Sequence, residues 1–403
     1  MSVLQGANFI LPLLAVPYLV RVLGVELYGL LAFATAMVMY FSILSDYGFN
    51  LTATREISIH RNSHEKIIEI FSAVMMIKII LMLVGLLILT IMVFSFEKFS
   101  EHWSIYFLSF GMVLGQVLFP IWFFQGMEKM KYISILNILA KSIAVIAIFL
   151  FIHSRGDYYL VPIFNSLGFV VAGIISLYYV KKEFNVSFKM QNVDTLKKYF
   201  MDGWHIFISR IAVVLYTSSN IFILGLFTNN TIVGIYSIAE QIITGIASLG
   251  SIVNRVLFPY LSKIWNQSKT NYYQKFNTIL KKIILGMLII AIILYMSSPY
   301  LIHLFAGHNI DEATMVLRIL AITVILFPLG GLFTQSFVAQ QENIYVTKVT
   351  ILTTLVNLLL VFILIYLFGV FGLAYTVLLT QIFHTLLNIY YYLHIKKKRT
   401  IYA

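Results

Sequence analysis

Residues 70–94 read IFSAVMMIKIILMLVGLLILTIMVF, an apolar run interrupted by a single charge at Lys78. A helix needs about 20 apolar residues to cross the hydrocarbon core of a bilayer, and this run is long enough to do so. Similar runs recur along the whole chain, in which 60% of the 403 residues are hydrophobic and 11% are charged. That composition leaves too little polar surface for water-facing domains, so the sequence predicts an integral membrane protein.

The lengths of the apolar runs, and the polar residues between them, predict about twelve membrane spans. They cover roughly residues 2–22, 27–49, 66–94, 102–125, 132–152, 158–180, 200–227, 231–258, 276–300, 311–339, 346–368 and 370–394. Helices are expected because the sequence lacks the short alternating strands of a membrane barrel, and a backbone in lipid must satisfy its own hydrogen bonds. The predicted fold class is an all-α polytopic integral membrane protein. Gly111 and Gly115 have the small-x-x-x-small spacing, which indicates close packing between helices of this chain.

The longest polar stretch inside the chain divides it into two halves of six predicted spans each. We expect an N-terminal lobe over residues 1–180, a cytoplasmic linker over 181–199, and a C-terminal lobe over 200–403 that ends in a basic cytoplasmic tail. Short matches such as Leu118-Phe119-Pro120 and Leu326-Phe327-Pro328 indicate that the halves arose by duplication. Six spans per copy give a parallel repeat, an arrangement found in transporters that hold their cargo between two halves.

The net charge of +12 comes from 28 Lys and Arg against 16 Asp and Glu. Most of the basic residues lie in predicted connections on one side of the membrane, among them Lys129, Lys131, Lys181, Lys182 and Lys396. Loops rich in Lys and Arg stay in the cytoplasm, so both termini are expected there. The excess charge therefore reflects topology and contact with anionic headgroups, and no nucleic-acid partner is expected.

Motifs that carry chemistry are missing from the sequence. With no Cys, the chain has no disulfide, iron–sulfur ligand or thiol nucleophile. It also lacks a Gly-rich phosphate loop, a nucleophile elbow and a His-Glu-x-x-His motif. His60 and His64 have a spacing that metal sites use, but their basic surroundings and the lack of a third ligand indicate a solvated linker. We therefore expect no enzyme activity, no metal site and no cofactor.

Basic side chains also fall inside predicted spans, where exposure to lipid would cost about 2.5–3.5 kcal/mol each. They are Lys78, Lys141, Arg210, Arg255 and Arg318, and Arg21 tops the first span. We expect them to form a ladder that attracts an anion, with phosphate the best match, and we assign Arg21, Lys78, Lys141, Arg210 and Arg318 to substrate binding. The alternatives are snorkelling or backbone carbonyl partners for Lys78 and Lys141, and a salt bridge to Glu240 for Arg210.

Acidic and amide side chains complete the predicted site. Glu240 is the one carboxylate deep in a predicted span, and Asp46 lies near the cytoplasmic face. We assign both as candidate gate or coupling residues, with proton or sodium as the coupling ion for Glu240. Gln125 and Asn220 are candidate contacts for sugar hydroxyls, with hydrogen bonds between helices as the alternative.

Three segments match the pattern of a known family. They are Pro17-Tyr18-Leu19-Val20-Arg21-Val22-Leu23-Gly24, then Asp46-Tyr47-Gly48-Phe49-Asn50 with Thr52-Ala53-Thr54-Arg55-Glu56, and then Pro120-Ile121-Trp122-Phe123-Phe124-Gln125-Gly126-Met127-Glu128. Together they resemble the signatures of Wzx-type flippases of O-antigen or polysaccharide repeat units, and the resemblance covers essentially the whole chain. Among the cations, only Arg21 matches a position of these signatures.

The resemblance implies the MATE-like fold of the multidrug/oligosaccharidyl-lipid/polysaccharide exporter superfamily. It also implies that the chain flips undecaprenyl-pyrophosphate-linked oligosaccharide, an O-antigen or capsule repeat unit, from the inner to the outer leaflet of the bacterial plasma membrane. The implied partners are this lipid-linked substrate, membrane lipids and a polysaccharide polymerase or assembly machinery. The chain begins almost directly in its first span, where such flippases carry a short basic lead, so we expect a truncated or alternative start.

Two other functions stay open at this point. An ion-coupled exporter of drugs or organic cations has the same fold and would show carboxylates where this chain has cations. A membrane glycan polymerase or ligase would need a sizeable outward loop with catalytic residues, whereas the outward loops predicted here are a few residues long.

Overall fold

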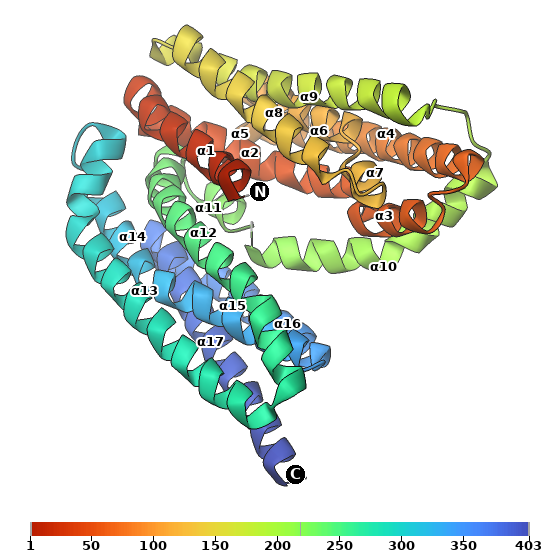
Figure 1. The fold of residues 1–403 in the computed structure, drawn as a ribbon. Helices are drawn as coiled ribbons and strands as arrows, with labels where there is room; N and C mark the ends of the chain where they lie inside the picture. The colour runs from red at the N-terminus through yellow and green to blue at the C-terminus, as the bar shows by residue number, and fades with distance from the viewer. Residues whose placement is uncertain (1, 218, 402–403) are drawn as a thin grey trace. The chain divides into compact units, whose positions relative to one another are not determined.

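The computed structural model describes residues 2–217 and 219–401, and every regular element in these ranges is helical (Figure 1). The chain forms two compact units, which divide between Val214 and Leu215. The prediction of an all-α polytopic fold is confirmed.

The first unit contains ten α-helices and one 3₁₀ helix among the described residues. They are α1 (Ser2–Leu23), α2 (Val25–Asp46), α3 (Phe49–Ile59), α4 (His64–Ser95), α5 (Glu97–Ser100), α6 (Trp103–Leu118), α7 (Ile121–Gly126), α8 (Met130–Phe151), η1 (Arg155–Tyr159), α9 (Leu160–Phe184) and most of α10 (Val193–Thr217). The second unit contains α11 (Ser219–Phe227), α12 (Asn230–Gln267), α13 (Lys269–Ala306), α14 (Asp311–Ala321), α15 (Thr323–Ala339), α16 (Asn343–Phe368) and α17 (Val370–Ile401).

Ten helical segments in the described part of the chain are long and apolar enough to cross a membrane. Each of them overlaps one of the predicted spans. The predicted spans 2–22 and 200–227 are not among the ten: the first contains a shorter apolar stretch, Leu13–Leu23, and the second corresponds to two separate helices, α10 and α11.

Local backbone chemistry sets where several of the long spans break. Tyr47 closes α2 in the left-handed region, with φ 49°, and Gly48 follows with φ 82°. This turn lies at the end of the predicted span 27–49 and separates α2 from α3, which extends beyond that span. Pro120 separates α6 from α7, because proline has no N–H to continue the helical hydrogen bonds.

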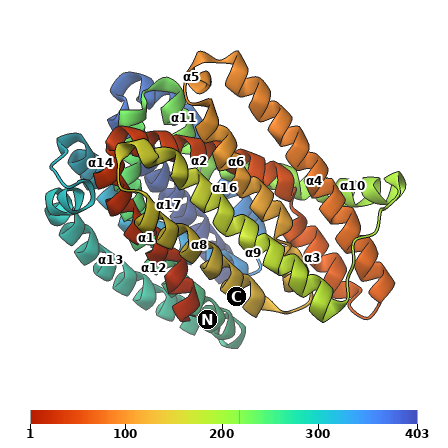
Figure 2. The same cartoon turned by 90° about the horizontal axis from the view of Figure 1, so that it is seen from above.

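The helices of the two units pack in the same pairwise pattern. In the first unit α6 and α8 both pack against α9, α2 against α6, and α1 against α8 (Figures 1 and 2). In the second unit α15 and α16 both pack against α17, α12 against α15, and α11 against α16. A duplicated six-span unit would give this correspondence, and the duplication stays a prediction.

Glycines on α6 let α9 approach closely. A Cβ on Gly111 would lie 2.8 Å from the Ser166 side chain, and a Cβ on Gly115 would lie 2.5 Å from that of Phe169. The small-x-x-x-small pair therefore packs helices within the chain, as its spacing predicts.

The ends of two corresponding helices repeat one unusual turn. Glu128 follows α7 with φ 57°, and the next amide, of Lys129, donates to the carbonyl oxygen of Phe124 at 2.8 Å. Gln341 follows α15 with φ 62°, and the amide of Glu342 donates to the carbonyl oxygen of Phe337 at 2.8 Å. A left-handed residue with this bond across five residues satisfies carbonyl groups that a helix end leaves open.

The first half of α10 is held by the first unit. Phe200 and Phe207 of α10 stack on Tyr47, with ring centroids 4.4 and 4.6 Å apart. A Cβ on Gly203 would lie 2.7 Å from the Tyr47 ring, so α10 runs directly over this side chain. Before α10 begins, the amide of Lys189 donates to Ser72 Oγ of α4 at 2.9 Å.

Candidate functional site

Lys78 is buried in the first unit, with 4% of its surface exposed. It lies on α4, and its Nζ donates to the backbone carbonyl of Gln116 on α6 at 3.4 Å. A carbonyl partner is one of the two alternatives that the sequence left open for this lysine. An ammonium group placed this deep is costly unless it is paired, so Lys78 is the cation of the first unit that most needs an explanation.

The other predicted cations of the first unit lie on three different helices. Arg21 is exposed in the last turn of α1, Lys141 is half-buried on α8, and Arg210 is exposed on α10. Arg318 lies in the second unit, on α14, where its guanidinium stacks over the ring of Tyr295 at 5.2 Å. A stacked arginine of this kind is stabilised by the negative face of the ring.

The predicted ladder draws its members from both units, so it stays a prediction. The predicted salt bridge between Arg210 and Glu240 also stays a prediction, because these residues belong to different units. The side chain of Arg255 lies outside the described residues.

The second and third signature segments meet at one corner of the first unit, where α3 packs against α7. The hydroxyl of Thr54 lies within hydrogen-bond distance of three acceptors: the Asn50 carbonyl at 3.0 Å, the Trp122 carbonyl at 3.2 Å and Gln125 Oε1 at 3.3 Å. Arg61 closes the corner by donating to the Gly126 carbonyl at 2.6 Å and to Glu128 at 2.8 Å. Gln125, a candidate sugar contact, thus has a partner inside the protein.

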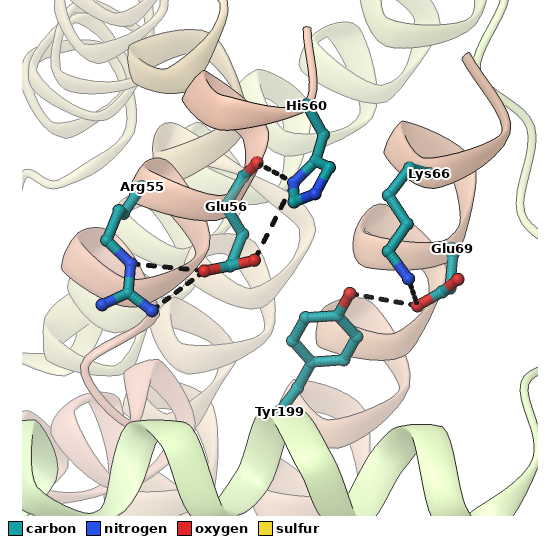
Figure 3. A network of polar contacts seen from close by, with 6 residues as sticks. All are labelled: Arg55, Glu56, His60, Lys66, Glu69 and Tyr199. Carbon is teal, nitrogen blue, oxygen red and sulfur yellow. Dashed lines mark hydrogen bonds and ion pairs between the residues drawn. The ribbon is translucent and has the colours of Figure 1, made fainter. Parts of the chain in front are cut away.

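Two groups of polar contacts lie beside this corner (Figure 3). On α3, Glu56 pairs with Arg55 at 2.9 Å, and the ring of His60 lies against the Glu56 carbonyl. On α4, Glu69 pairs with Lys66 at 2.6 Å and accepts a hydrogen bond from Tyr199 of α10 at 3.1 Å.

Burial and the Glu69 carboxylate raise the pKa of Tyr199, so its phenol keeps its proton and donates. The Tyr199–Glu69 contact is a second attachment of α10 to the first unit.

No group of three or more potential metal ligands is found among the described residues.

Asp46 sits at the last position of α2, and its Oδ1 accepts a hydrogen bond from the Asn50 amide at 2.7 Å. This contact bridges the Tyr47-Gly48 turn. The assignment of Asp46 as a gate stays a prediction.

The second unit contains a partly open cavity of about 410 Å³, which we call the chamber. Its lining residues are Asn220, Tyr236, Glu240, Ile243, Thr244, Ala247, Leu320, Phe327, Asn357, Val377, Thr380, Gln381 and His384. Glu240, the predicted gate or coupling residue, and Asn220, a predicted sugar contact, therefore line the same cavity. Neither lysine nor arginine occurs among these lining residues.

Several polar groups of the chamber lack a partner. The Oδ1 atoms of Asn220 and Asn357 are buried and accept no hydrogen bond from any described residue. Asn357 Nδ2 donates to Thr380 Oγ1 at 3.3 Å, which orients that amide. Within the described part of the second unit, Glu240 forms no hydrogen bond or ion pair. A buried polar group without a partner costs about 1–3 kcal/mol, so these atoms indicate a site that is completed by something else.

The sequence assignment missed the contribution of α17 to the chamber. Thr380, Gln381 and His384 line the chamber, and because His384 follows the other two by four and three residues, all three share one helix face. That spacing in a membrane span was the available signal, since polar residues in such spans face the protein interior.

Comparison with solved structures shows the fold. An inward-facing multidrug-resistance transporter of the MATE family in the MOP superfamily superposes with a TM-score of 0.70 at 13% identity, covering 96% of this chain and 99% of that one. An inward closed structure of the lipid II flippase MurJ superposes with a TM-score of 0.67 at 17% identity, covering 96% of this chain and 86% of that one. The fold is that of the MOP superfamily transporters.

Sequence comparison then gives the family. Residues 1–265 match the family described as "Polysaccharide biosynthesis protein". A relative from Escherichia coli K12 is 32% identical over 384 residues, covering 94% of this chain and 92% of its own, and one from Shigella dysenteriae is 26% identical over 385 residues, covering 94% of each. Both bear the name "Putative O-antigen transporter". The chain belongs to this polysaccharide biosynthesis protein family, which confirms the resemblance to Wzx-type flippases.

Proposed function

We propose that this chain is a flippase that moves an undecaprenyl-pyrophosphate-linked oligosaccharide from the inner to the outer leaflet of the bacterial plasma membrane. The observation that carries the proposal is the match along nearly the whole chain to relatives named for O-antigen transport. In this proposal the chain is a transporter rather than an enzyme, and both of its termini lie in the cytoplasm.

The proposed mechanism is alternating access, with the two units moving relative to each other around the cargo. Arg21, Lys78, Lys141, Arg210 and Arg318 attract the pyrophosphate, because Arg and Lys are the side chains that best recognise phosphate oxygens. The polyprenyl tail stays in lipid, since burying its apolar surface elsewhere gains nothing. An interaction with the polymerase that consumes the flipped repeat unit is part of the same proposal.

Two energy sources fit the described residues. A negative cytoplasm favours outward movement of an anionic cargo by about 2.3 kcal/mol per charge at 100 mV. Glu240 is the proposed site of any additional coupling to protons or sodium, because it is a carboxylate in the interior of the second unit with no ion-pair partner described there.

The test is a strain that lacks this gene and its complementation by the intact chain. Lipid-linked repeat units should accumulate on the inner leaflet of the deletion strain and should be cleared when the chain is restored. Normal surface polysaccharide in the deletion strain, with no such intermediate, would overturn the proposal.

A second function has one observation in its favour. The chamber contains the carboxylate of Glu240 and no lysine or arginine among its lining residues, which is the charge pattern of an organic-cation exporter. If that function is correct, expression of the chain should raise resistance to cationic dyes such as ethidium. The lipid-linked intermediates would then be unchanged by deletion.

A further inference from the structure

The polar lining of the chamber is not explained by the proposed binding of pyrophosphate to lysine and arginine. A pyrophosphate group would not enter it, because its lining offers the carboxylate of Glu240 and no lysine or arginine. The cargo of the proposed function has a second part, however, which is a string of sugar rings rich in hydroxyl groups.

The lining matches hydroxyl groups in several ways. The Oδ1 atoms of Asn220 and Asn357 are buried acceptors without a partner among the described residues, and a sugar hydroxyl is a donor that would satisfy each of them. Glu240 and Gln381 add further polar groups from two other helices. Acceptors that come from α11, α12, α16 and α17 surround a ligand rather than bind it from one side.

The size of the chamber fits a sugar better than a bare ion. At about 410 Å³ it exceeds by more than tenfold the roughly 30 Å³ that one water occupies in the liquid. Small-molecule sites range over roughly 300–1,000 Å³ and combine apolar walls with a few placed polar groups. The rings of Tyr236 and Phe327, together with Leu320 and Val377, supply such walls.

We propose that the chamber binds a neutral sugar ring of the lipid-linked cargo, with Asn220 and Asn357 accepting hydrogen bonds from its hydroxyls and Glu240 excluding acidic sugars. This proposal rests on the proposed function and names the part of the cargo that the second unit recognises. The pyrophosphate is left to the cations outside the chamber.

The experiment uses the purified full chain in nanodiscs and saturation-transfer NMR with three probes. Methyl β-glucoside and methyl N-acetyl-β-glucosaminide are the neutral probes, and methyl β-glucuronide is the acidic one. We expect saturation transfer to both neutral glycosides to be at least fivefold stronger than to the glucuronide.

Matched variants locate the binding. Asn220→Leu and Asn357→Leu should each reduce transfer to the neutral glycosides at least fivefold. Gln335→Leu is the control, because it removes another amide of the second unit, one whose Oε1 is buried without a described partner but which does not line the chamber. Glu240→Gln should keep the neutral glycosides and weaken the discrimination against the glucuronide, since Gln keeps the size and one acceptor oxygen of the side chain and loses the negative charge.

A variant that keeps every polar group of the chamber controls for the possibility that the Asn variants misfold. Because the chain has no Cys, Val377→Cys provides a single thiol in the chamber wall. The neutral glycosides should slow its reaction with a small methanethiosulfonate at least threefold, and the glucuronide should not.

Three results would overturn the proposal. The first is the absence of both saturation transfer and protection for the neutral glycosides. The second is sodium-dependent thermal stabilisation that Glu240→Gln abolishes while no glycoside binds, which would make the chamber an ion site. The third is binding of tetraphenylphosphonium in place of glycosides. Only the deletion-strain assay bears on the flippase function itself, so a chain that flips cargo but binds no glycoside would refute the sugar site alone.

Discussion

The ring of Tyr47 stacks on the ring of Phe207, with the centroids 4.6 Å apart and the planes 23° from parallel. Tyr47 ends α2, near the start of the chain, whereas Phe207 lies in α10, beyond the predicted linker between the halves. The contact shows that the helix which enters the second half of the sequence is packed, over its first turns, on the first half of the structure.

Substitutions of Tyr47 should distinguish the contribution of its ring to stability from that of its hydroxyl. Tyr47→Ala removes the stacking with Phe200 and Phe207 and should destabilise the protein by about 3–5 kcal/mol. Tyr47→Phe should be neutral or stabilising by about 1 kcal/mol, because the Tyr47 hydroxyl is buried and has no hydrogen-bond partner among the described residues. Thermal unfolding of the detergent-solubilised variants measures both. Equal destabilisation by Ala and Phe would contradict the role given to the ring.

Gly48→Ala should loosen α10 from the first unit. The position has φ 82°, where an added side chain costs about 1–2 kcal/mol. The new Cβ would also lie 2.6 Å from Ile206 Cγ2. We expect a clear fall in melting temperature and in export. The double variant with Ile206→Ala should recover only part of the loss, since it relieves the clash and leaves the backbone strain; complete recovery would show that strain contributes nothing.

Lys78→Met tests whether the buried ammonium acts on cargo. Methionine preserves most of the volume and removes a charge that is costly to bury, so the melting temperature should be unchanged or higher. Export should nevertheless fall at least tenfold if the ammonium attracts the pyrophosphate. The readouts are surface polysaccharide and the melting temperature of the same variant. Normal export with raised stability would make Lys78 a structural residue that bonds the Gln116 carbonyl.

Glu240→Gln tests energy coupling in proteoliposomes. Glutamine keeps the size and hydrogen bonding of the side chain but cannot bind a proton or balance a cation. With a membrane potential alone, the native chain and the variant should flip cargo at the same rate. With an imposed proton or sodium gradient, only the native chain should accelerate. Gradient-driven acceleration that survives in the variant would exclude Glu240 as the coupling residue.

The spans and the fold class could be predicted because they depend on the length of apolar runs, which the sequence displays directly. The partner of Lys78 could not, because it is a backbone carbonyl that every residue possesses and no sequence pattern marks. Gln125 shows the same limit. Its depth suggested a sugar contact, but whether an amide faces cargo or a neighbouring helix depends on side-chain packing. Here Gln125 Oε1 accepts a hydrogen bond from the Thr54 hydroxyl. The chamber is lined by residues from six helices, and hydropathy does not show how those helices come together.

The attachment of α10 to the first unit also constrains how the chain is made. A ribosome that has released only residues 1–180 has not yet produced Tyr199, Phe200 or Phe207, so Tyr47 and Glu69 still lack the groups that cover and bond them in the finished molecule. The packing of the first unit is therefore complete only after the start of the seventh predicted span has been synthesised. We therefore expect residues 1–180, made alone, to leave the Tyr47 ring uncovered, and a fragment extended to residue 214 to cover it.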